Sequence, residues 1–261
     1  MDSLSISSTQ NPRIKHLMAL QQKAQLRRSE QQIVVEGARE VLHCINAGFK
    51  VITIFYSPEI FDISALPRSN CELIKVTTQV YEKIAYRGST EGVIAIVKPK
   101  QVTLADIELG SDPLIVVLEG VEKPGNIGAV LRSADAAHAT AVIVCDPLTD
   151  LYNPNLIRSS IGAIFTVPCV ACTSAQCIQF LKEKKINILT AQLQDSEPYY
   201  NTPMREATAI VMGTEATGLT QAWRQAATAH IRIPMQGSLD SLNVSVSTAI
   251  LLFEAVRQRL T

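Results

Sequence analysis

Three loops in the second half of the sequence carry residues that could bind a cofactor and assist a reaction. Each loop contains glycine together with polar side chains, and each follows a run of aliphatic and β-branched residues; the loops are 119–132, 213–219 and 233–245. A glycine-bearing loop that opens a helix can present backbone N–H groups to an anion, or let a ligand approach the backbone closely.

Each loop also has a purely structural interpretation. Glu215, between Gly213 and Gly218, could orient a ligand or could simply favour the N-terminus of a helix. Ser241 and Asn243 precede an apolar helix, where capping is the usual role of small polar residues. The first loop has neither the GxGxxG spacing of a dinucleotide site nor the GK[ST] ending of a phosphate loop, which disfavours a nicotinamide oxidoreductase and a nucleotide hydrolase.

Strands that alternate with helices must position these loops. The expected strands are residues 114–118, 141–145, 166–170, 186–191, 209–212 and 231–233. This alternation predicts an α/β fold with a mainly parallel sheet, in which ligands collect beyond the carboxyl ends of the strands. We therefore expect the site at the loops that follow Leu118, Ala191, Met212 and Ile233.

A smaller α/β unit precedes this sheet. Its expected strands are residues 33–35, 51–56, 73–76 and 93–97, and its expected helices begin at Pro12, after Gly37 and at Thr78. The unit closes at Lys98-Pro99-Lys100, and the polar stretch up to Asp112-Pro113 indicates a linker. The sequence thus predicts two domains, residues 1–105 and 106–261.

The composition indicates a folded protein, because 47% of the 261 residues are hydrophobic and 18% are charged. No apolar run approaches the roughly 18 residues that a membrane span needs. The first twenty residues hold no continuous apolar stretch, which disfavours a secretory signal. We therefore expect a cytoplasmic protein with no membrane partner.

The net charge of zero conceals an asymmetry. Residues 1–100 hold 13 Lys+Arg against 9 Asp+Glu, a net of +4, and residues 101–261 hold 11 against 15, a net of −4. The basic residues near the start, Arg13 to Arg28, could form a solvated helix face or a surface that contacts nucleic-acid phosphates.

The six cysteines favour free thiols over a metal site. Cys169, Cys172 and Cys177 form a CxxC followed by a third thiol, but no fourth ligand lies nearby and the four histidines are scattered. Buried free thiols are the more common arrangement in an intracellular protein, so no metal is expected.

Taken together, the loops carry a family resemblance. The segments GNIGAVLRSADA (125–136), IVMGTEATGL (210–219) and IRIPMQGSLDSLNVSVSTAILLFE (231–254) resemble the three ordered motifs of the SpoU-like (TrmH-type) branch of the SPOUT superfamily. Members of that branch are S-adenosylmethionine-dependent RNA ribose 2′-O-methyltransferases. The segments VVEGAREVLHCINAG and RGSTEGVIAIV in the first half resemble the ribosomal-protein-like RNA-binding domain that precedes the catalytic domain in this family.

The resemblance implies a fold and a site that periodicity alone does not. It implies a parallel sheet whose C-terminal segment threads a loop as a trefoil knot, and a homodimer built with the last helix. The positions matching the cofactor contacts are Gly213, Ile233 and Leu242, and those matching the reaction centre are Asn126, Arg132, Glu215, Ser241 and Asn243. No metal is implied.

The expected substrate is RNA, with ribosomal RNA preferred over transfer RNA because of the full N-terminal α/β domain. Two alternatives stay open at this point: a transfer-RNA 2′-O-methyltransferase, and a non-catalytic RNA-binding protein of ribosome assembly on the same fold. Arg132 matches the residue to which the family's catalytic role is most often assigned. Since an arginine side chain stays protonated in proteins, we expect it to act on the RNA phosphate or on the forming alkoxide.

Overall fold

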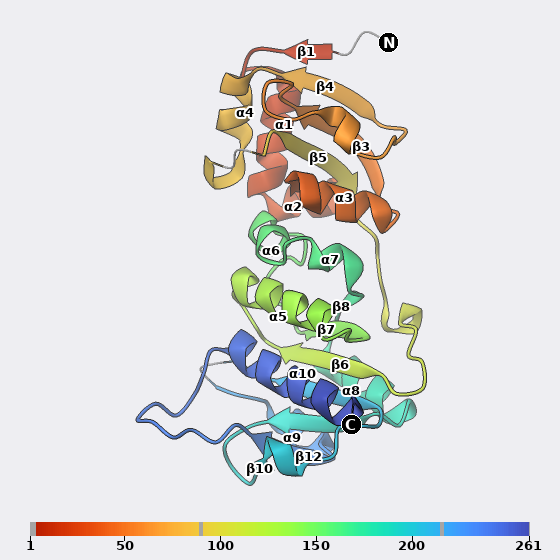
Figure 1. Cartoon of the computed structure of the whole chain (residues 1–261), viewed down its shortest axis with the longest axis vertical. Helices are drawn as coiled ribbons and strands as arrows, with labels where there is room; N and C mark the ends of the chain where they lie inside the picture. The colour runs from red at the N-terminus through yellow and green to blue at the C-terminus, as the bar shows by residue number, and fades with distance from the viewer. Residues whose placement is uncertain (1–3, 89–90, 215–216, 261) are drawn as a thin grey trace. The chain divides into compact units, whose positions relative to one another are not determined.

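The computed structural model describes residues 4–88, 91–214 and 217–260, and it divides into two compact units. The first unit takes in the described part of 1–101 together with Tyr152–Thr166, and the second comprises Val102–Leu151 and the described part of 167–261. Figure 1 traces the chain through both units by colour. Within the described residues, no helix combines the length and the apolar character that crossing a membrane requires.

The first unit is built on a five-stranded mixed sheet. The strands lie in the order β1-β4-β3-β5-β2, with β1 and β3 parallel to β4, and with β5 antiparallel to both β2 and β3. They are β1 (Leu4–Ile6), β2 (Ile33–Glu36), β3 (Lys50–Tyr56), β4 (Glu72–Val76) and β5 (Val93–Lys98). The helices are α1 (Pro12–Gln22), α2 (Ala24–Glu30), α3 (Ala38–Asn46) and α4 (Thr78–Ile84), with short 3₁₀ turns at Ile63–Ala65 and Tyr86–Gly88.

Local sequence signals account for the helix starts in this unit. The Asn11 side chain accepts a hydrogen bond from the Arg13 N–H at 2.9 Å and Pro12 occupies the first helical position of α1, as the Asn-Pro pair predicts. Thr77 caps α4 in the same way through the Val80 N–H. The apolar faces of α1 and α4 then bury Leu17, Leu20 and Ile84 against the sheet.

Two short helices from the middle of the chain complete the first unit. These are α6 (Pro154–Ser159) and α7 (Ala163–Thr166), which pack against β2 and α3. The Phe165 ring lies edge-on to Phe49, with centroids 5.1 Å apart, and the Tyr152 hydroxyl donates to the Lys100 carbonyl at 3.0 Å. The domain boundary expected from the sequence leaves residues 152–166 in the second domain, because the burial partner of a segment is not visible in its own spacing.

The second unit is a seven-stranded sheet in which all strands are parallel, as the strand–helix alternation predicts. The order is β10-β12-β9-β11-β6-β7-β8. The strands are β6 (Leu114–Glu119), β7 (Ala141–Cys145), β8 (Cys169–Cys172), β9 (Asn187–Ala191), β10 (Glu197–Pro198), β11 (Thr208–Met212) and β12 (Ala229–Arg232). All residues of β6, β7 and β11 are buried, which explains their almost unbroken apolar sequences.

Helices flank this parallel sheet. They are α5 (Pro124–Ala136), α8 (Ser174–Glu183), α9 (Gln221–Ala226) and α10 (Val244–Leu260), with 3₁₀ turns at Leu104–Asp106 and Tyr199–Asn201. Figure 1 shows α10, at the blue end of the chain, running beside α5, and the two helices are in contact. The expected strand at 166–170 begins later, at Cys169, because Thr166 ends α7 and Pro168 intervenes.

Candidate functional site

A hollow of about 360 Å³ opens in the second unit beyond the carboxyl ends of its strands. Its walls are the loops that follow β9, β11 and β12, together with the first turns of α10. The three positions expected to contact a cofactor, Gly213, Ile233 and Leu242, all line this hollow, and so does Ser241. The structure therefore gathers four of the eight expected site residues around one cavity.

The loop after β11 forms a tight turn that requires glycine at its first position. The Gly218 N–H donates to the Thr214 carbonyl at 3.0 Å, which closes the turn back onto itself. A Cβ on Gly213 would lie 2.4 Å from the Gly218 carbonyl carbon and 2.6 Å from the Leu219 nitrogen. Any side chain larger than hydrogen would push this turn open. Glu215, one of the expected reaction-centre residues, lies outside the described residues.

Glu119, at the end of β6, has a buried carboxylate that binds Thr220, directly after this turn. Glu119 is only 6% exposed, and its Oε2 accepts the Thr220 N–H at 2.8 Å while its Oε1 accepts the Thr220 hydroxyl at 2.7 Å. The Ser174 hydroxyl at the start of α8 lies 3.2 Å from the same carboxylate and accepts the Trp223 indole N–H at 3.1 Å. Glu119 thus holds the start of α9, directly after the turn, in place.

Two side chains of the hollow were not singled out in the sequence. Gln192 Oε1, in the loop after β9, and Arg224 Nε, on α9, are buried and have no hydrogen-bond partner within the part of the chain that the structure describes. Buried polar groups normally find partners, so these two atoms point to a polar ligand in the hollow. Only the position of Gln192 directly after a predicted strand could have drawn attention to it, and nothing in the local sequence marks Arg224.

The first and third motif loops meet at a pair of asparagines. The Asn243 Nδ2 donates to Asn126 Oδ1 at 3.3 Å, across 117 positions of sequence. Asn243 also caps α10, because its Oδ1 accepts the Ser245 N–H at 3.0 Å. Asn243 therefore both caps a helix and joins two of the motif loops, so its structural and functional interpretations are compatible. The neighbouring Ser241 hydroxyl donates to Asp240 Oδ1 at 3.2 Å.

Arg132 stands apart from these contacts. It lies on α5, six residues beyond Asn126, and its side chain is exposed. Six residues correspond to about 9 Å along a helix and leave the two side chains on different faces. Among the described residues Arg132 has no hydrogen bond or ion pair, so its guanidinium is available to an RNA phosphate or sugar.

The cysteine cluster differs from the CxxC expected in the sequence. The sulfur atoms of Cys145, Cys172 and Cys177 lie within 4.8 Å of one another, and Cys169 is not part of this group. Cys145 joins because it is the neighbour of Cys172 in the β7–β8 register. Its hydrogen bond to the Cys172 sulfur, together with burial, raises the pKa of the Cys145 thiol, so this thiol stays protonated.

Comparison with known proteins agrees with this geometry. Residues 113–253 match the model of the SpoU rRNA Methylase family, and residues 11–95 match the MRM3-like substrate binding domain. The chain belongs to the SpoU rRNA methylase family. It is therefore an S-adenosylmethionine-dependent RNA ribose 2′-O-methyltransferase, as the three motifs predict, and it acts on ribosomal RNA, as the full N-terminal α/β domain predicts.

Individual relatives of this SpoU methylase match most of its length. The 23S rRNA (guanosine-2′-O-)-methyltransferase RlmB of Vibrio vulnificus is 36% identical over 204 residues, which are 76% of this chain and 83% of the relative. A crystal structure of an RNA 2′-O ribose methyltransferase is 38% identical, with a TM-score of 0.87 over 99% of this chain and 100% of the other. An AdoMet-bound rRNA methyltransferase from Sinorhizobium meliloti is 27% identical, with a TM-score of 0.90 over 98% of both chains.

The polar atoms and the glycine that line the hollow fit S-adenosylmethionine, the cofactor of this family. The unpartnered Gln192 Oε1 and Arg224 Nε offer a hydrogen-bond acceptor and a donor, and a molecule with an amino-acid tail, a ribose and an adenine can satisfy both. Glycine at 213 leaves room for such a molecule to approach the backbone. These polar side chains of the protein lie at the ends of the strands. The described residues that line the hollow include no metal-binding cluster.

Proposed function

We propose that this SpoU methylase modifies the ribose 2′-hydroxyl of a guanosine in 23S ribosomal RNA. The hollow at the strand ends, which gathers Gly213, Ser241 and Leu242 beside the Asn126–Asn243 contact, supports the methyl transfer. The likeness to RlmB proteins over 76% of the chain supports the choice of RNA and nucleoside. The structural observation that carries the proposal is the meeting of the first and third motif loops next to the hollow.

In this proposal Gly213, Ile233 and Leu242 hold the cofactor, chiefly through their backbone groups. S-adenosylmethionine, when bound, supplies a methyl group on a positively charged sulfur. The chain has to place the ribose oxygen in line behind that methyl group at near-attack distance, which lowers the entropic part of the barrier. The narrow turn at Gly213 serves this requirement, because it fixes one wall of the hollow.

The second requirement is to remove the proton of the ribose hydroxyl. Asn126 and Asn243 orient the ribose, and Ser241 contacts the target nucleotide. The Arg132 guanidinium stays protonated, so it stabilises the forming alkoxide or binds the adjacent phosphate while the hydroxyl proton leaves to solvent. Glu215 is assigned to the same centre as a ligand-orienting carboxylate. The methyl group moves from sulfur to oxygen, and the neutral thioether departs.

A homodimer through the last helix is part of the proposal. Val246, Phe253 and Leu260 are spaced seven residues apart on α10, and their side chains are 47%, 47% and 82% exposed. Seven residues are close to two helical turns, so the three side chains form one apolar stripe. A contiguous apolar stripe of this kind is typical of an interaction surface.

We further propose that residues 1–105 bind the RNA and that residues 106–261 form the catalytic domain, with its C-terminal segment passed through a loop as a trefoil knot. Lys15, Lys23 and Arg28 are exposed and available to phosphates. Arg27 is not, because it is only 4% exposed and donates to the Leu20 carbonyl at 2.6 Å. An enzyme with this substrate acts in the cytoplasm, where ribosomal RNA is found.

Alkaline hydrolysis tests the proposal directly, because a methylated 2′-oxygen cannot attack its own phosphate. Purified protein, S-adenosylmethionine and 23S rRNA from a strain lacking the gene should yield one new protected linkage, on the 3′ side of a guanosine. The Arg132→Ala protein serves as the inactive control. A protected linkage at another base, or protection only in transfer RNA, would overturn the substrate assignment.

A further inference from the structure

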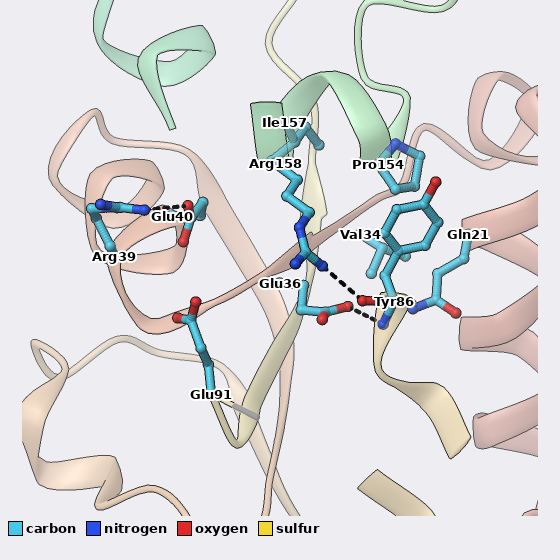
Figure 2. A pocket seen from close by; sticks show the side chains of 10 residues that line it. All are labelled: Gln21, Val34, Glu36, Arg39, Glu40, Tyr86, Glu91, Pro154, Ile157 and Arg158. Carbon is cyan, nitrogen blue, oxygen red and sulfur yellow. Dashed lines mark hydrogen bonds and ion pairs between the residues drawn. The ribbon is translucent and has the colours of Figure 1, made fainter. Parts of the chain in front are cut away.

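A second hollow, of about 200 Å³, lies in the first unit at the start of α3. Figure 2 shows its polar side chains pointing inward from β2, α3, α6 and the segment before β5. It is lined by three carboxylates and two guanidiniums, together with an aromatic ring, from Glu36, Glu40, Glu91, Arg39, Arg158 and Tyr86. None of these residues belongs to the methyl-transfer site.

The most buried carboxylate of this hollow belongs to Glu40. Glu40 is only 4% exposed, and its Oε2 has no hydrogen bond to any residue that the structure describes, while its Oε1 lies 3.3 Å from Arg39 Nη2. Burying a carboxylate oxygen without a hydrogen bond is costly, so the position calls for a ligand that donates. A Cβ on Gly37 would lie 2.3 Å from this oxygen and 2.9 Å from Glu91 Oε2, which shows how closely both carboxylates approach the glycine.

Hydrogen bonds hold three further polar side chains of the hollow, those of Glu36, Glu91 and Arg158. Glu91 Oε2 accepts the Ala38 N–H at 2.9 Å, and Glu36 Oε2 accepts the Tyr86 N–H at 2.7 Å. The Arg158 Nη1 donates to the Tyr86 carbonyl at 2.8 Å, as Figure 2 shows. These bonds fix an acceptor-rich wall, and the Tyr86 ring is also part of the lining.

This chemistry narrows the class of ligand. The three carboxylates outnumber the two guanidiniums, so the hollow favours a neutral or cationic ligand over a phosphate or another anion. A bare metal ion fits poorly, because the oxygens of the three glutamates do not gather within 4.8 Å of one another among the described residues. A planar base with several N–H groups can instead span the separated acceptors and stack on an aromatic ring or a guanidinium plane.

We propose that this hollow is a binding site for an unpaired guanine base of the RNA substrate. Guanine is the base whose Watson–Crick edge carries two adjacent donor groups, N1–H and N2–H₂, which match a carboxylate acceptor. Glu40 accepts from this edge, Tyr86 stacks on the ring, and Arg39 at the rim is available to the flanking phosphate. The site selects a nucleotide of the RNA independently of cofactor binding.

Guanosine, inosine and adenosine are suitable probes, since the three nucleosides differ only at the base edge. Their affinities for the full-length protein can be measured by saturation-transfer NMR. Inosine lacks the 2-amino group, and one hydrogen bond to a charged acceptor is worth about 1.5–3 kcal/mol. We therefore expect guanosine to bind roughly tenfold more tightly than inosine, or better, and more tightly still than adenosine.

Glu40→Gln should weaken guanosine binding and abolish the preference for guanosine over inosine, because an amide offers one acceptor and one donor in place of two acceptors. Glu82→Gln, an exposed glutamate of α4 in the same unit, is the matched control and should change neither value. Cofactor affinity, measured by calorimetry, should be unchanged in both variants.

Three results would overturn the proposal. The first is equal affinity of the unsubstituted protein for guanosine, inosine and adenosine, or no binding of any of them. The second is an unchanged guanosine preference in a folded Glu40→Gln protein. The third is displacement of guanosine by millimolar Mg²⁺, which would indicate a cation site. Because the nucleoside comparison needs no substitution, it stays decisive even if Glu40→Gln fails to fold.

Discussion

Replacing Gly213 with alanine tests how the turn after β11 shapes the cofactor site. The added Cβ would lie 2.4 Å from the Gly218 carbonyl carbon, 2.5 Å from its oxygen and 2.6 Å from the Leu219 nitrogen. Carbon atoms in van der Waals contact are about 3.5–4.0 Å apart, so the facing backbone must move by roughly 1 Å. All three atoms belong to the backbone, and a rotamer change cannot relieve the overlap.

Overpacking of this kind costs about 1–3 kcal/mol. If the turn opens in the free protein, the cost is seen as weaker cofactor binding, a loss of roughly 5- to 150-fold in affinity. If the strain persists in the folded state, the same cost is seen as a lower free energy of unfolding. The sum of the two effects should therefore reach at least about 1 kcal/mol.

Calorimetry with S-adenosylhomocysteine and urea unfolding measure the two effects separately. Gly237→Ala is the matched control, because a Cβ at that loop position meets no atom within 4 Å. Its affinity and unfolding free energy should equal those of the unsubstituted protein. If Gly213→Ala behaved like Gly237→Ala in both measurements, the turn would not constrain the hollow and the role given to Gly213 would be wrong.

Further predictions address the other parts of the proposal. Arg132→Ala should abolish methylation of ribosomal RNA while leaving calorimetric cofactor affinity nearly intact; near-normal turnover would remove Arg132 from the reaction centre. Glu119→Ala removes the charged acceptor of the Thr220 N–H and hydroxyl and should lower the free energy of unfolding in urea by about 1–3 kcal/mol. An unchanged unfolding midpoint would contradict the anchoring role. Phe253→Glu places a charge in the apolar stripe of α10 and should shift the protein to a monomer in sedimentation experiments, whereas a persistent dimer would exclude this surface. Replacing Lys15 and Lys23 with glutamine should make RNA binding less dependent on salt. The slope of log affinity against log salt concentration should fall by roughly 0.7–0.9 for each phosphate that the side chains no longer neutralise. An unaltered slope would show that α1 and the start of α2 do not bind RNA.

Much of the second unit could be predicted from local signals. The runs at 114–118, 141–145 and 209–212 become β6, β7 and β11 almost unchanged, because strands buried on both faces need unbroken apolar sequence. The strand expected at 166–170 lies instead at Cys169–Cys172, because Thr166 ends α7 and Pro168 separates that helix from the strand. The two-residue strand β10 was missed because so short an edge strand has no periodicity to detect.

The candidate site was predictable in its residues but not in its contacts. The motifs predict the loops that carry Gly213, Ile233 and Leu242, which line the hollow. Gln192 directly follows a predicted strand, but nothing in the local sequence marks Arg224. Neither could be recognised as an unpartnered buried group, because only the loops that enclose a side chain make it one. The CxxC spacing was similarly incomplete, since strand register adds Cys145 and leaves Cys169 out.

The sequence by itself determined the class of the protein. Ordered motifs, the alternation of strands and helices, and the +4 and −4 halves reflect local chemistry, which is written directly in residue order. Only the tertiary structure decided that Asn126 meets Asn243, that Arg27 is buried while Lys23 is exposed, and that Glu40 has an unpartnered oxygen in a hollow of the first unit. Burial and hydrogen-bond satisfaction depend on segments far apart in the chain, so residue spacing cannot show them.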